Sequence, residues 1–377
     1  DRIRGEKAEN LELAIRCYNA ALEVRTRTAF PEDWATTQNN LGAAYSDRIR
    51  GGKAENIELA IGCCKAALEV YTRTAFPQDW AMTQYNLASV YVNRIRGEKA
   101  ENIEQAIACF QAALKVYTRT AFAFQWAATQ NNLGAAYTNR IRGEKAENIE
   151  QAIASYKGAL EVYTRAAFPQ NWAMTQMGLG GAYTTRIRGD KAENIEQAIA
   201  SFNAALEVHT RTAFAFQWAA TQNNLGAAYT NRIRGEKAEN IEQAIASYKG
   251  ALEVYTRAAF PQNWAMTQMG LGGAYTTRIR GDKAENIEQA IASFNAALEV
   301  HTRTAFPQNW AMMQHNLGLA YRNRIEGEKT ENIEQAIASY QAALEVLTRA
   351  AFPFEWARIQ NALGIAYLDH IQGDKAE

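Results

Sequence analysis

Residues 126–171 read WAATQNNLGAAYTNRIRGEKAENIEQAIASYKGALEVYTRAAFPQN, and copies of this 46-residue unit make up the chain. The first position of the unit holds every tryptophan of the sequence, namely Trp34, Trp80, Trp126, Trp172, Trp218, Trp264, Trp310 and Trp356. A fixed period of about 20 to 50 residues is typical of solenoids, in which each unit buries its apolar face against its neighbours. We therefore expect residues 1–377 to form one elongated solenoid domain.

The first half of the unit predicts an amphipathic helix, which we call helix A. Trp126, Leu133 and Tyr137 are seven and four residues apart, so they lie on one face of a helix. We expect each helix A to begin near a proline such as Pro169, because proline suits the first helical turn. We expect it to end at a glycine such as Gly143, which suits a left-handed cap.

The second half of the unit predicts helix B. Asn148 is followed three residues later by Gln151, which is the pattern of a capping box at a helix start. Apolar residues then recur with helical period up to Tyr163, and we expect the helix to end around residues 167–168. Helices A and B should form antiparallel pairs joined by short loops.

The two ends of the chain fall in the same register of the unit. The sequence begins with DRIRGEKAE and ends with the matching DHIQGDKAE, which suggests a piece excised from a longer array. We expect seven complete A–B pairs, a first helix B at residues 10–29 and a last helix A near 353–371. Repeat arrays need polar capping helices for solubility. Without one, we expect adhesive ends that dock onto further repeats or self-associate.

Composition narrows the classes of partner. The 40 Lys and Arg balance the 40 Asp and Glu, so no basic field favours nucleic acid or an anionic membrane surface. No apolar run reaches the roughly 18 to 20 residues needed to cross a bilayer, and no signal-peptide pattern opens the chain. Cys17, Cys63 and Cys109 hold one position in successive units, too far apart for disulfides. Free thiols favour a cytoplasmic location.

The unit resembles a tetratricopeptide repeat, through the pattern L-G-x-x-Y in helix A and A-x-x-x-(Y/F)-x-x-A in helix B. It is longer than the common form of that repeat, and its tryptophan stands seven residues before the leucine. In this respect it is similar to extended bacterial repeats that often accompany a CHAT protease domain, and distantly to kinesin light chain repeats. The resemblance implies an all-α right-handed superhelix with helix A on its concave wall. The residues that carry it are Leu133, Gly134, Tyr137, Ala152, Tyr156 and Ala159.

No residue pattern predicts catalysis, a cofactor or a metal. His209 and His301 replace a tyrosine of other units and lie two units apart, so they cannot converge on one site. His315 takes an Asn or Met position and His370 an Arg position. Metal-binding, nucleophile and phosphate-binding motifs are absent from the sequence. We therefore predict a protein that is not an enzyme.

The candidate binding residues are positions of helix A that the Leu, Gly and Tyr packing leaves free. Amide side chains can both donate to and accept from a peptide backbone, although water or a neighbouring Gln would satisfy them equally well. The first set lies two residues before the leucine of the L-G-x-x-Y pattern, and the second set lies about two turns further along helix A. The predicted peptide-binding residues are Asn39, Tyr85, Asn131, Met177, Asn223, Met269 and His315 in the first set, and Asn93, Asn139, Asn231 and Asn323 in the second.

Two further features admit a functional or a structural interpretation. Glycines inside a helix cost roughly 0.5 to 1 kcal/mol each relative to alanine. Gly178 and Gly181, beside Met177, either form a trough for a partner's bulky side chain or reflect loose packing. One arginine per unit, such as Arg140, either receives acidic side chains or pairs locally with the helix end and the glutamates of EKAE. We favour local pairing.

These observations predict a scaffold that binds a protein or peptide along the concave face of the array. The first alternative is a structural array that self-associates into a dimer or filament. The second is a regulatory arm of a CHAT-type protease or signalling protein, which the resemblance suggests. Residues 118–214 are identical to residues 210–306, so agreements between these two blocks count as one observation. Natural duplication and engineering explain that identity equally well.

Overall fold

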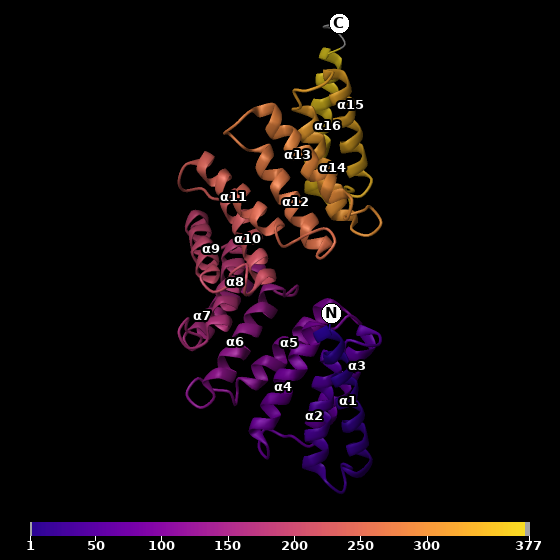
Figure 1. The fold of residues 1–377 in the computed structure, drawn as a ribbon, viewed down its shortest axis with the longest axis vertical. Coiled ribbons are helices and arrows are strands. Elements are labelled where there is room, and N and C mark those ends of the chain that lie inside the picture. Colours follow the sequence, from indigo (N-terminus) through magenta and orange to yellow (C-terminus); the bar gives the residue numbers. More distant parts are fainter. Residues whose placement is uncertain (1, 374–377) are drawn as a thin grey trace. The chain divides into compact units, whose positions relative to one another are not determined.

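The computed structural model describes residues 2–373, and every regular element in that range is an α-helix (Figure 1). Even-numbered helices are helix A of the repeat and odd-numbered helices are helix B. In chain order the helices are α1 (Arg2–Val24), α2 (Pro31–Asp47), α3 (Lys53–Leu68), α4 (Pro77–Val92), α5 (Lys99–Ala113), α6 (Ala123–Thr138), α7 (Lys145–Leu160), α8 (Pro169–Thr185), α9 (Lys191–Leu206), α10 (Ala215–Thr230), α11 (Lys237–Leu252), α12 (Pro261–Thr276), α13 (Lys283–Leu298), α14 (Pro307–Arg322), α15 (Lys329–Leu344) and α16 (Pro353–Gly373).

Helix A begins where the sequence predicts and ends earlier. The proline of the FPQ segment is the first residue of α8, as expected. However, α6 ends at Thr138, with Asn139 as its cap, and Gly143 lies in the loop beyond. Gly143 has a φ of 79°, so it adopts the left-handed conformation as predicted, but in the turn that leads into helix B. The predicted glycine cap of helix A was therefore wrong.

The predicted cap of helix B was also wrong, because the Asn148 side chain forms hydrogen bonds with the preceding loop instead. Helix α7 begins at Lys145, which places Asn148 inside its first turn, 3% exposed. The Asn148 Nδ2 donates to the carbonyl oxygen of Arg142 at 2.9 Å, and its Oδ1 accepts from Arg140 Nη1 at 3.3 Å. This buried amide holds the RIRG loop against helix B. Its contacts cross the loop, so neighbouring residues in the sequence do not reveal them.

Helix B is shorter than predicted. Helix α7 ends at Leu160, and the following residues form a separate turn before α8. In that turn the backbone N–H of Phe168 donates to the Thr164 carbonyl oxygen at 2.9 Å, and the Ala167 N–H donates to the Thr164 hydroxyl oxygen at 3.2 Å. Thr164 thus supplies acceptors that close an independent turn. The apolar period continues through this turn, which is why the sequence suggested a longer helix.

Alanine and glycine allow the two helices of a pair to pack closely. Ala127 of α6 and Ala159 of α7 are both fully buried, and Trp126 and Phe168 cover their cluster. Deeper in the pair, a Cβ at Gly134 would lie 3.0 Å from the Tyr156 ring. Small residues therefore sit where an aromatic ring from helix B needs space. The same contact recurs between Gly226 and Tyr248, Gly272 and Phe294, and Gly318 and Tyr340.

The chain divides into two compact units, residues 1–191 and 192–377. Within each unit an even-numbered helix contacts the next even-numbered helix, for example α4 with α6 and α12 with α14. Consecutive odd-numbered helices make no such contact in the described residues. Helix A therefore lies on the inner side of each unit and helix B on the outer side. A single continuous solenoid over residues 1–377 stays a prediction.

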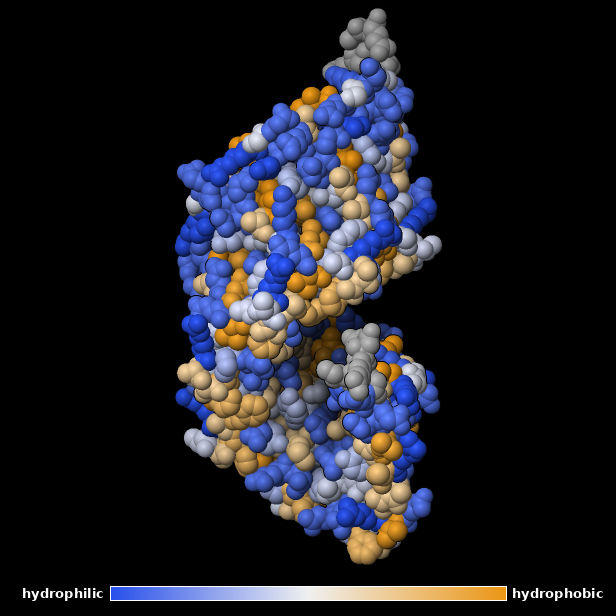
Figure 2. All heavy atoms as spheres, viewed as in Figure 1, coloured by the Kyte–Doolittle hydropathy of each residue, from blue (hydrophilic) through white to orange (hydrophobic). Residues whose placement is uncertain are grey.

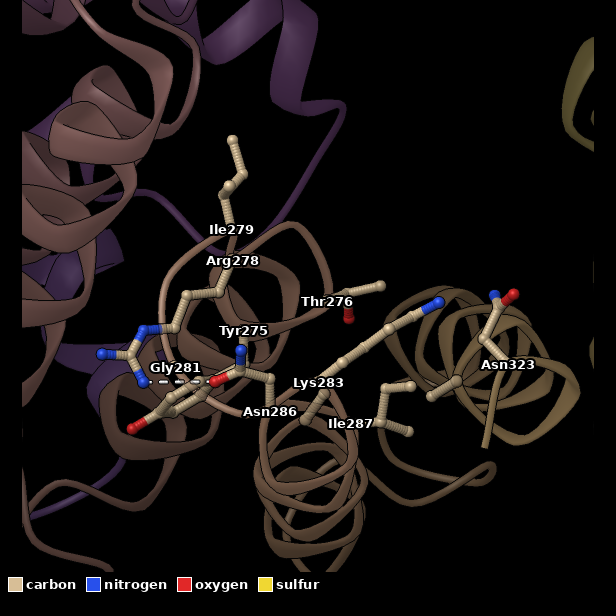
Figure 3. Close-up of a pocket in the computed structure, with 11 residues that line it drawn as sticks. Tyr275, Thr276, Arg278, Ile279, Gly281, Lys283, Asn286, Ile287 and Asn323 are labelled. Carbon is tan, nitrogen blue, oxygen red and sulfur yellow. Dashed lines mark hydrogen bonds between the residues drawn. The ribbon is translucent and has the colours of Figure 1, made fainter. Parts of the chain in front are cut away.

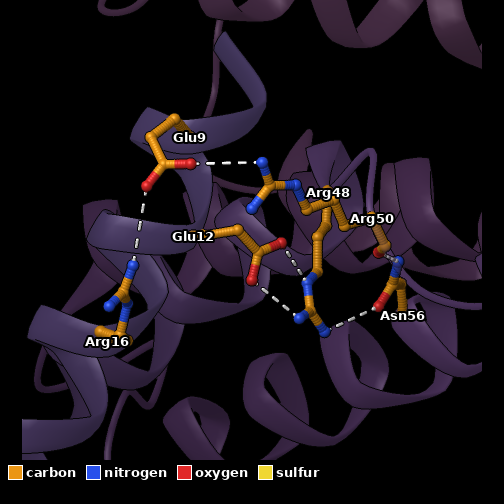
Figure 4. Close-up of polar contacts among 6 residues, drawn as sticks. All are labelled: Glu9, Glu12, Arg16, Arg48, Arg50 and Asn56. Carbon is orange, nitrogen blue, oxygen red and sulfur yellow. Dashed lines mark hydrogen bonds and ion pairs between the residues drawn. The ribbon is translucent and has the colours of Figure 1, made fainter. Parts of the chain in front are cut away.

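One arginine per repeat joins each helix A end to the preceding helix B, so the predicted local pairing was wrong. Arg140 Nε and Nη2 donate to Glu104 Oε1 and Oε2, both at 2.8 Å, across 36 residues of sequence. Figure 4 shows the first of these pairs, in which Arg48 contacts Glu12 and also Asn56. Paired in this way, the arginines stabilise repeat stacking and are not open to acidic partners. The same pairing links Arg94 with Glu58, Arg186 with Glu150, Arg232 with Glu196, Arg278 with Glu242, and Arg324 with Glu288.

Candidate binding face

The first set of predicted residues lies between consecutive even-numbered helices. Asn131 of α6 is half-buried, and its Oδ1 accepts from the Thr175 hydroxyl of α8 at 2.9 Å. Asn223 of α10 accepts from Thr267 of α12 in the same way at 3.0 Å. These amides therefore help to hold neighbouring repeats together. Substituting them would disturb stacking as well as any partner contact.

Two members of the first set are buried and do not offer their polar atoms to a partner. Asn39 is 3% exposed, and its Oδ1 accepts from Asn86 Nδ2 at 3.2 Å. His315 is also 3% exposed, and its ring packs 5.7 Å from the Tyr340 ring. Burial, with a smaller contribution from the Arg358 charge, lowers the pKa of His315 to about 4. The sequence pattern placed both residues on the inner helices but did not show that neighbouring helices cover them.

The second set is exposed on the inner helices. Asn93, Asn139, Asn231 and Asn323 follow the last turn of their helices, and each donates Nδ2 to the carbonyl oxygen four residues earlier, at 2.8 to 3.0 Å. One such bond leaves the amide oxygen and the other N–H for a partner. These asparagines are therefore the most accessible amides among the predicted residues. They recur once per repeat, except where Asp or Thr takes the position.

The glycine trough forms only in part. A Cβ at Gly178 would lie 2.7 Å from Tyr156 Cε1 and Cζ, so this position is occupied by the protein's own aromatic ring. Of the two interpretations left open, neither a trough nor loose packing holds at Gly178. Gly181 differs, because a Cβ there would meet no atom within 4 Å. The half-buried Met177 and the open Gly181 remain as features of the inner face of α8.

A pocket between α4 and α6 was missed by the sequence pattern. It encloses about 250 Å³ and is lined mainly by aromatic and thioether side chains, together with two amides. Tyr85 belongs to it, and its hydroxyl accepts from Asn132 Nδ2 at 2.9 Å. Met82 and Phe124 are 40% and 44% exposed, which is high for large apolar residues. The lining residues are Met82, Tyr85, Asn86, Tyr117, Phe124, Gln125 and Ala128.

A second pocket, of about 340 Å³, surrounds the loop between α12 and α13 (Figure 3). Its wall includes Asn323, which follows the last residue of α14, and the Lys283 side chain extends toward this amide in Figure 3. Arg278, also in the wall, donates Nη1 to Asn286 Oδ1 at 3.1 Å. The pocket therefore brings one predicted asparagine beside an ammonium group. Ile279, 60% exposed, adds an apolar edge.

An exposed apolar residue also recurs in the loop that follows helix A of successive repeats. The RIRG loop, and its equivalents in other repeats, presents one isoleucine that is 52% to 61% exposed. Hydrophobic side chains interrupt the hydrophilic surface on the face shown in Figure 2. The sequence signal that marks them is an isoleucine between two charged residues in a loop. This series is Ile49, Ile95, Ile141, Ile187, Ile233, Ile279 and Ile325.

The described residues contain no cluster of three or more His, Cys, Asp or Glu that could hold a metal ion. No helix in that part of the chain is long and apolar enough to cross a membrane. Burial raises the pKa of Cys63 to about 11 and that of Cys64 to about 12, so both thiols are protonated near neutral pH. His209 and His301 are each 1% exposed and lie apart from solvent. None of these groups forms a site with the asparagines.

Comparison with known proteins identifies the repeat. The family model described as tetratricopeptide repeat matches residues 126–162 and 218–254. The chain contains tetratricopeptide repeats. Because the same repeat recurs every 46 residues, this match identifies the kind of repeat from which both compact units of the chain are built. Tetratricopeptide repeat folds are typical of protein interaction scaffolds and are generally not catalytic. No curated protein matches the chain.

Among solved structures, the apo form of RapI supports the helical repeat fold. The apo form of RapI aligns with a TM-score of 0.51 and 11% identity, covering 97% of each chain. A Rap protein complexed with competence and sporulation factor has a TM-score of 0.49 and 13% identity, over 98% of this chain and 99% of the other. The P58(IPK) TPR domain has a TM-score of 0.32 and 13% identity, over 98% and 96%.

Proposed function

We propose that this chain binds an extended segment of a partner protein along the inner, even-numbered helices. The observation that carries the proposal is the set of exposed asparagines that follow helix A in half of the repeats, Asn93, Asn139, Asn231 and Asn323. Each keeps an acceptor and a donor free after its intrahelical bond. A peptide in extended conformation presents backbone N–H and C=O groups that need such partners. Their periodic spacing suits a partner that follows the array.

The pocket between α4 and α6 supplies the apolar part of the proposed recognition. Met82 and Phe124 would contact a large apolar side chain, since both already lie exposed at the pocket wall. Tyr85, which accepts a hydrogen bond from Asn132, lines the same pocket. Burial of one such side chain contributes about 1.5 to 3 kcal/mol to binding. The pocket therefore acts as an anchor, while the asparagines hold the backbone.

The stacking arginines indicate what the partner is not. In Arg140, for example, Nε and Nη2 donate to Glu104 of the preceding helix B, and Nη1 donates to Asn148 of the following helix B. An acidic partner could bind one of these arginines only if it displaced the partly buried glutamate. The proposed partner segment is accordingly recognised by backbone contacts and an apolar anchor rather than by a run of acidic residues.

Selection from a display library of random peptides tests this proposal. Peptides enriched on the chain should carry a large apolar residue, and their affinity should fall at least about tenfold in the double variant Asn93→Ala, Asn139→Ala. Gln105→Ala is the matched control, because Gln105 is an exposed amide on the outer helix α5 that also bonds within its own helix. Equal binding to the double variant and the control would refute the asparagine contacts.

A further inference from the structure

Exposed arginine–glutamate pairs join the turns that follow successive outer helices. Arg119, between α5 and α6, forms an ion pair with Glu161, the residue after the end of α7. The two side chains are 57% and 49% exposed, and the residues stand 42 positions apart in the sequence. A glutamate at this position therefore neutralises an arginine of the preceding turn. The same pairing links Arg27 with Glu69, Arg211 with Glu253, Arg257 with Glu299, and Arg303 with Glu345.

At one junction a lysine takes the position of that glutamate. The residue at the same separation from Arg73 is Lys115. Both side chains are exposed, and no ion pair or hydrogen bond with another described residue engages either of them. Two cations at one junction repel each other, so this exchange does not stabilise the stacking of the repeats. The two free charges are therefore a feature that the fold itself does not explain.

The two cations lie next to the pocket between α4 and α6. Lys115 stands two residues before Tyr117, which lines that pocket, so the Cα atoms of the two residues are at most about 7 Å apart. In other repeats the arginine at the position of Arg73 lies over the tryptophan seven residues later, 5.6 to 6.0 Å from the ring centroid. The tryptophan that follows Arg73 in this way is Trp80, which packs against the cluster that includes Tyr117.

One acidic residue lies in this region, and it does not neutralise the two cations. Burial, with smaller contributions from the charges of Asp79 and Tyr85, raises the pKa of Tyr117 to about 12. Asp79 is therefore near the pocket, but it forms no ion pair with Arg73 or Lys115 in the part of the chain that the structure describes. One carboxylate against two cations leaves the surroundings of the pocket positively charged.

We propose that Arg73 and Lys115 bind an acidic side chain of the partner segment, an Asp or Glu within about three residues of the apolar side chain that enters the pocket. The inference rests on the proposed function and names the chemistry of its partner. A guanidinium can donate to both oxygens of a carboxylate, and the lysine adds a second positive charge. An extended segment advances about 3.3 Å per residue, so an acid at this spacing reaches the two cations while the anchor stays in the pocket.

An acid and an apolar side chain together would fix how the partner lies on the array. Backbone contacts with the asparagines recur along the array, so they do not distinguish one register of the segment from another. A pocket with charge on one side accepts only a segment whose acid and apolar residue have the matching order and spacing. A single acidic residue is sufficient, which agrees with the engagement of the stacking arginines by their own glutamates.

Parallel selections from a random peptide library test the acidic contact. Lys115→Glu supplies the acid found at the other junctions, so it should pair with Arg73 and leave the urea midpoint of unfolding unchanged or higher. A lower midpoint would contradict the pairing at this junction. Peptides enriched on the wild-type chain should carry Asp or Glu within about three residues of a large apolar residue. Those enriched on Lys115→Glu should keep the apolar residue and lose the acid.

The outcomes of these selections separate the two proposals. Wild-type peptides that carry the apolar residue but no preferred acid would overturn the acidic contact and leave the proposed function standing. Enrichment of no peptide at all would overturn both.

Calorimetry with one selected peptide measures the size of the effect. The wild-type chain should bind the acidic peptide at least about tenfold more tightly than the same peptide with its acid replaced by alanine, and Lys115→Glu should bind both equally. Lys65→Glu is the matched control, because Lys65 is an exposed lysine on the outer helix α3 and its exchange changes the net charge by the same amount. This control should keep the tenfold preference, which added salt should reduce. An equal preference in the two variants would overturn the inference.

Discussion

Two glycines three residues apart in α8 should respond to the same substitution with opposite signs. In Gly178→Ala the new Cβ would lie 2.7 Å from Tyr156 Cε1 and Cζ and 2.9 Å from its hydroxyl oxygen. Overpacking of this kind costs about 1 to 3 kcal/mol, and the better helix propensity of alanine offsets only about 0.5 to 1 kcal/mol. We expect a net loss of up to about 2.5 kcal/mol in the free energy of unfolding. Gly181→Ala meets no atom within 4 Å, so it should gain about 0.5 to 1 kcal/mol.

Urea denaturation followed by far-ultraviolet circular dichroism measures both effects. The concentration should be low enough that the chain is monomeric, because association would add stability. The unfolding midpoint should fall for Gly178→Ala and rise for Gly181→Ala. Midpoints that move in the same direction would refute the assignment of Gly178 to the Tyr156 ring and of Gly181 to open surface.

Three further predictions follow from the packing, the buried histidine and the pocket. Arg140→Ala should lower the free energy of unfolding by about 1 to 2 kcal/mol, because it leaves a partly buried glutamate unpaired. Arg119→Ala breaks an exposed pair and should change the free energy of unfolding by less than about 1 kcal/mol in the same urea assay. The pKa of His315 in the folded state lies below its usual value, so the unfolded chain binds a proton at this residue at a higher pH than the folded chain. The free energy of unfolding should therefore fall as the pH drops from about 6.5 toward 4. His315→Met should reduce this loss in thermal melts across that range. Met82→Ala should weaken binding of a selected peptide by about three- to tenfold in calorimetry, while Leu59→Ala, which removes an equally exposed residue from the outer helix α3, should leave it unchanged.

The repeat period and the apolar spacing predicted the helices and their alternation, because both depend on interactions within a few turns. Boundaries were less accurate where a side chain bonds outside its own helix. Asn148 has the sequence pattern of a cap, yet it holds the carbonyl oxygen of Arg142 in the preceding loop. Arg140 stands near the glutamates of its own loop, but stacking brings Glu104 of the preceding helix B into a two-bond contact. The sequence of a single 46-residue repeat does not predict which residues of the neighbouring repeats it contacts.

At the candidate face too, spacing within one repeat predicts the position of a residue, whereas contacts between repeats determine whether it is buried. Spacing on helix A was enough to place Asn139 on the inner side, and the structure finds it exposed. The burial of Asn39 depends on the side chain at Asn86 in the next repeat, which the position within one unit does not predict. The pocket at Met82 and Phe124 needs two consecutive inner helices to form its walls. The sequence therefore predicts which helices carry the candidate face, while the exposure of its side chains depends on stacking between repeats.

Site-specific photocrosslinking tests the proposed binding face most directly. A photoreactive amino acid replaces either Met82 on α4 or Leu59 on α3, two residues that are each 40% exposed. A peptide selected from a random library is then added, and crosslinked product is quantified by mass spectrometry. Recognition along the inner helices predicts a crosslink at position 82 and little at position 59. A stronger crosslink at position 59 would place the partner on the outer helices and contradict the account.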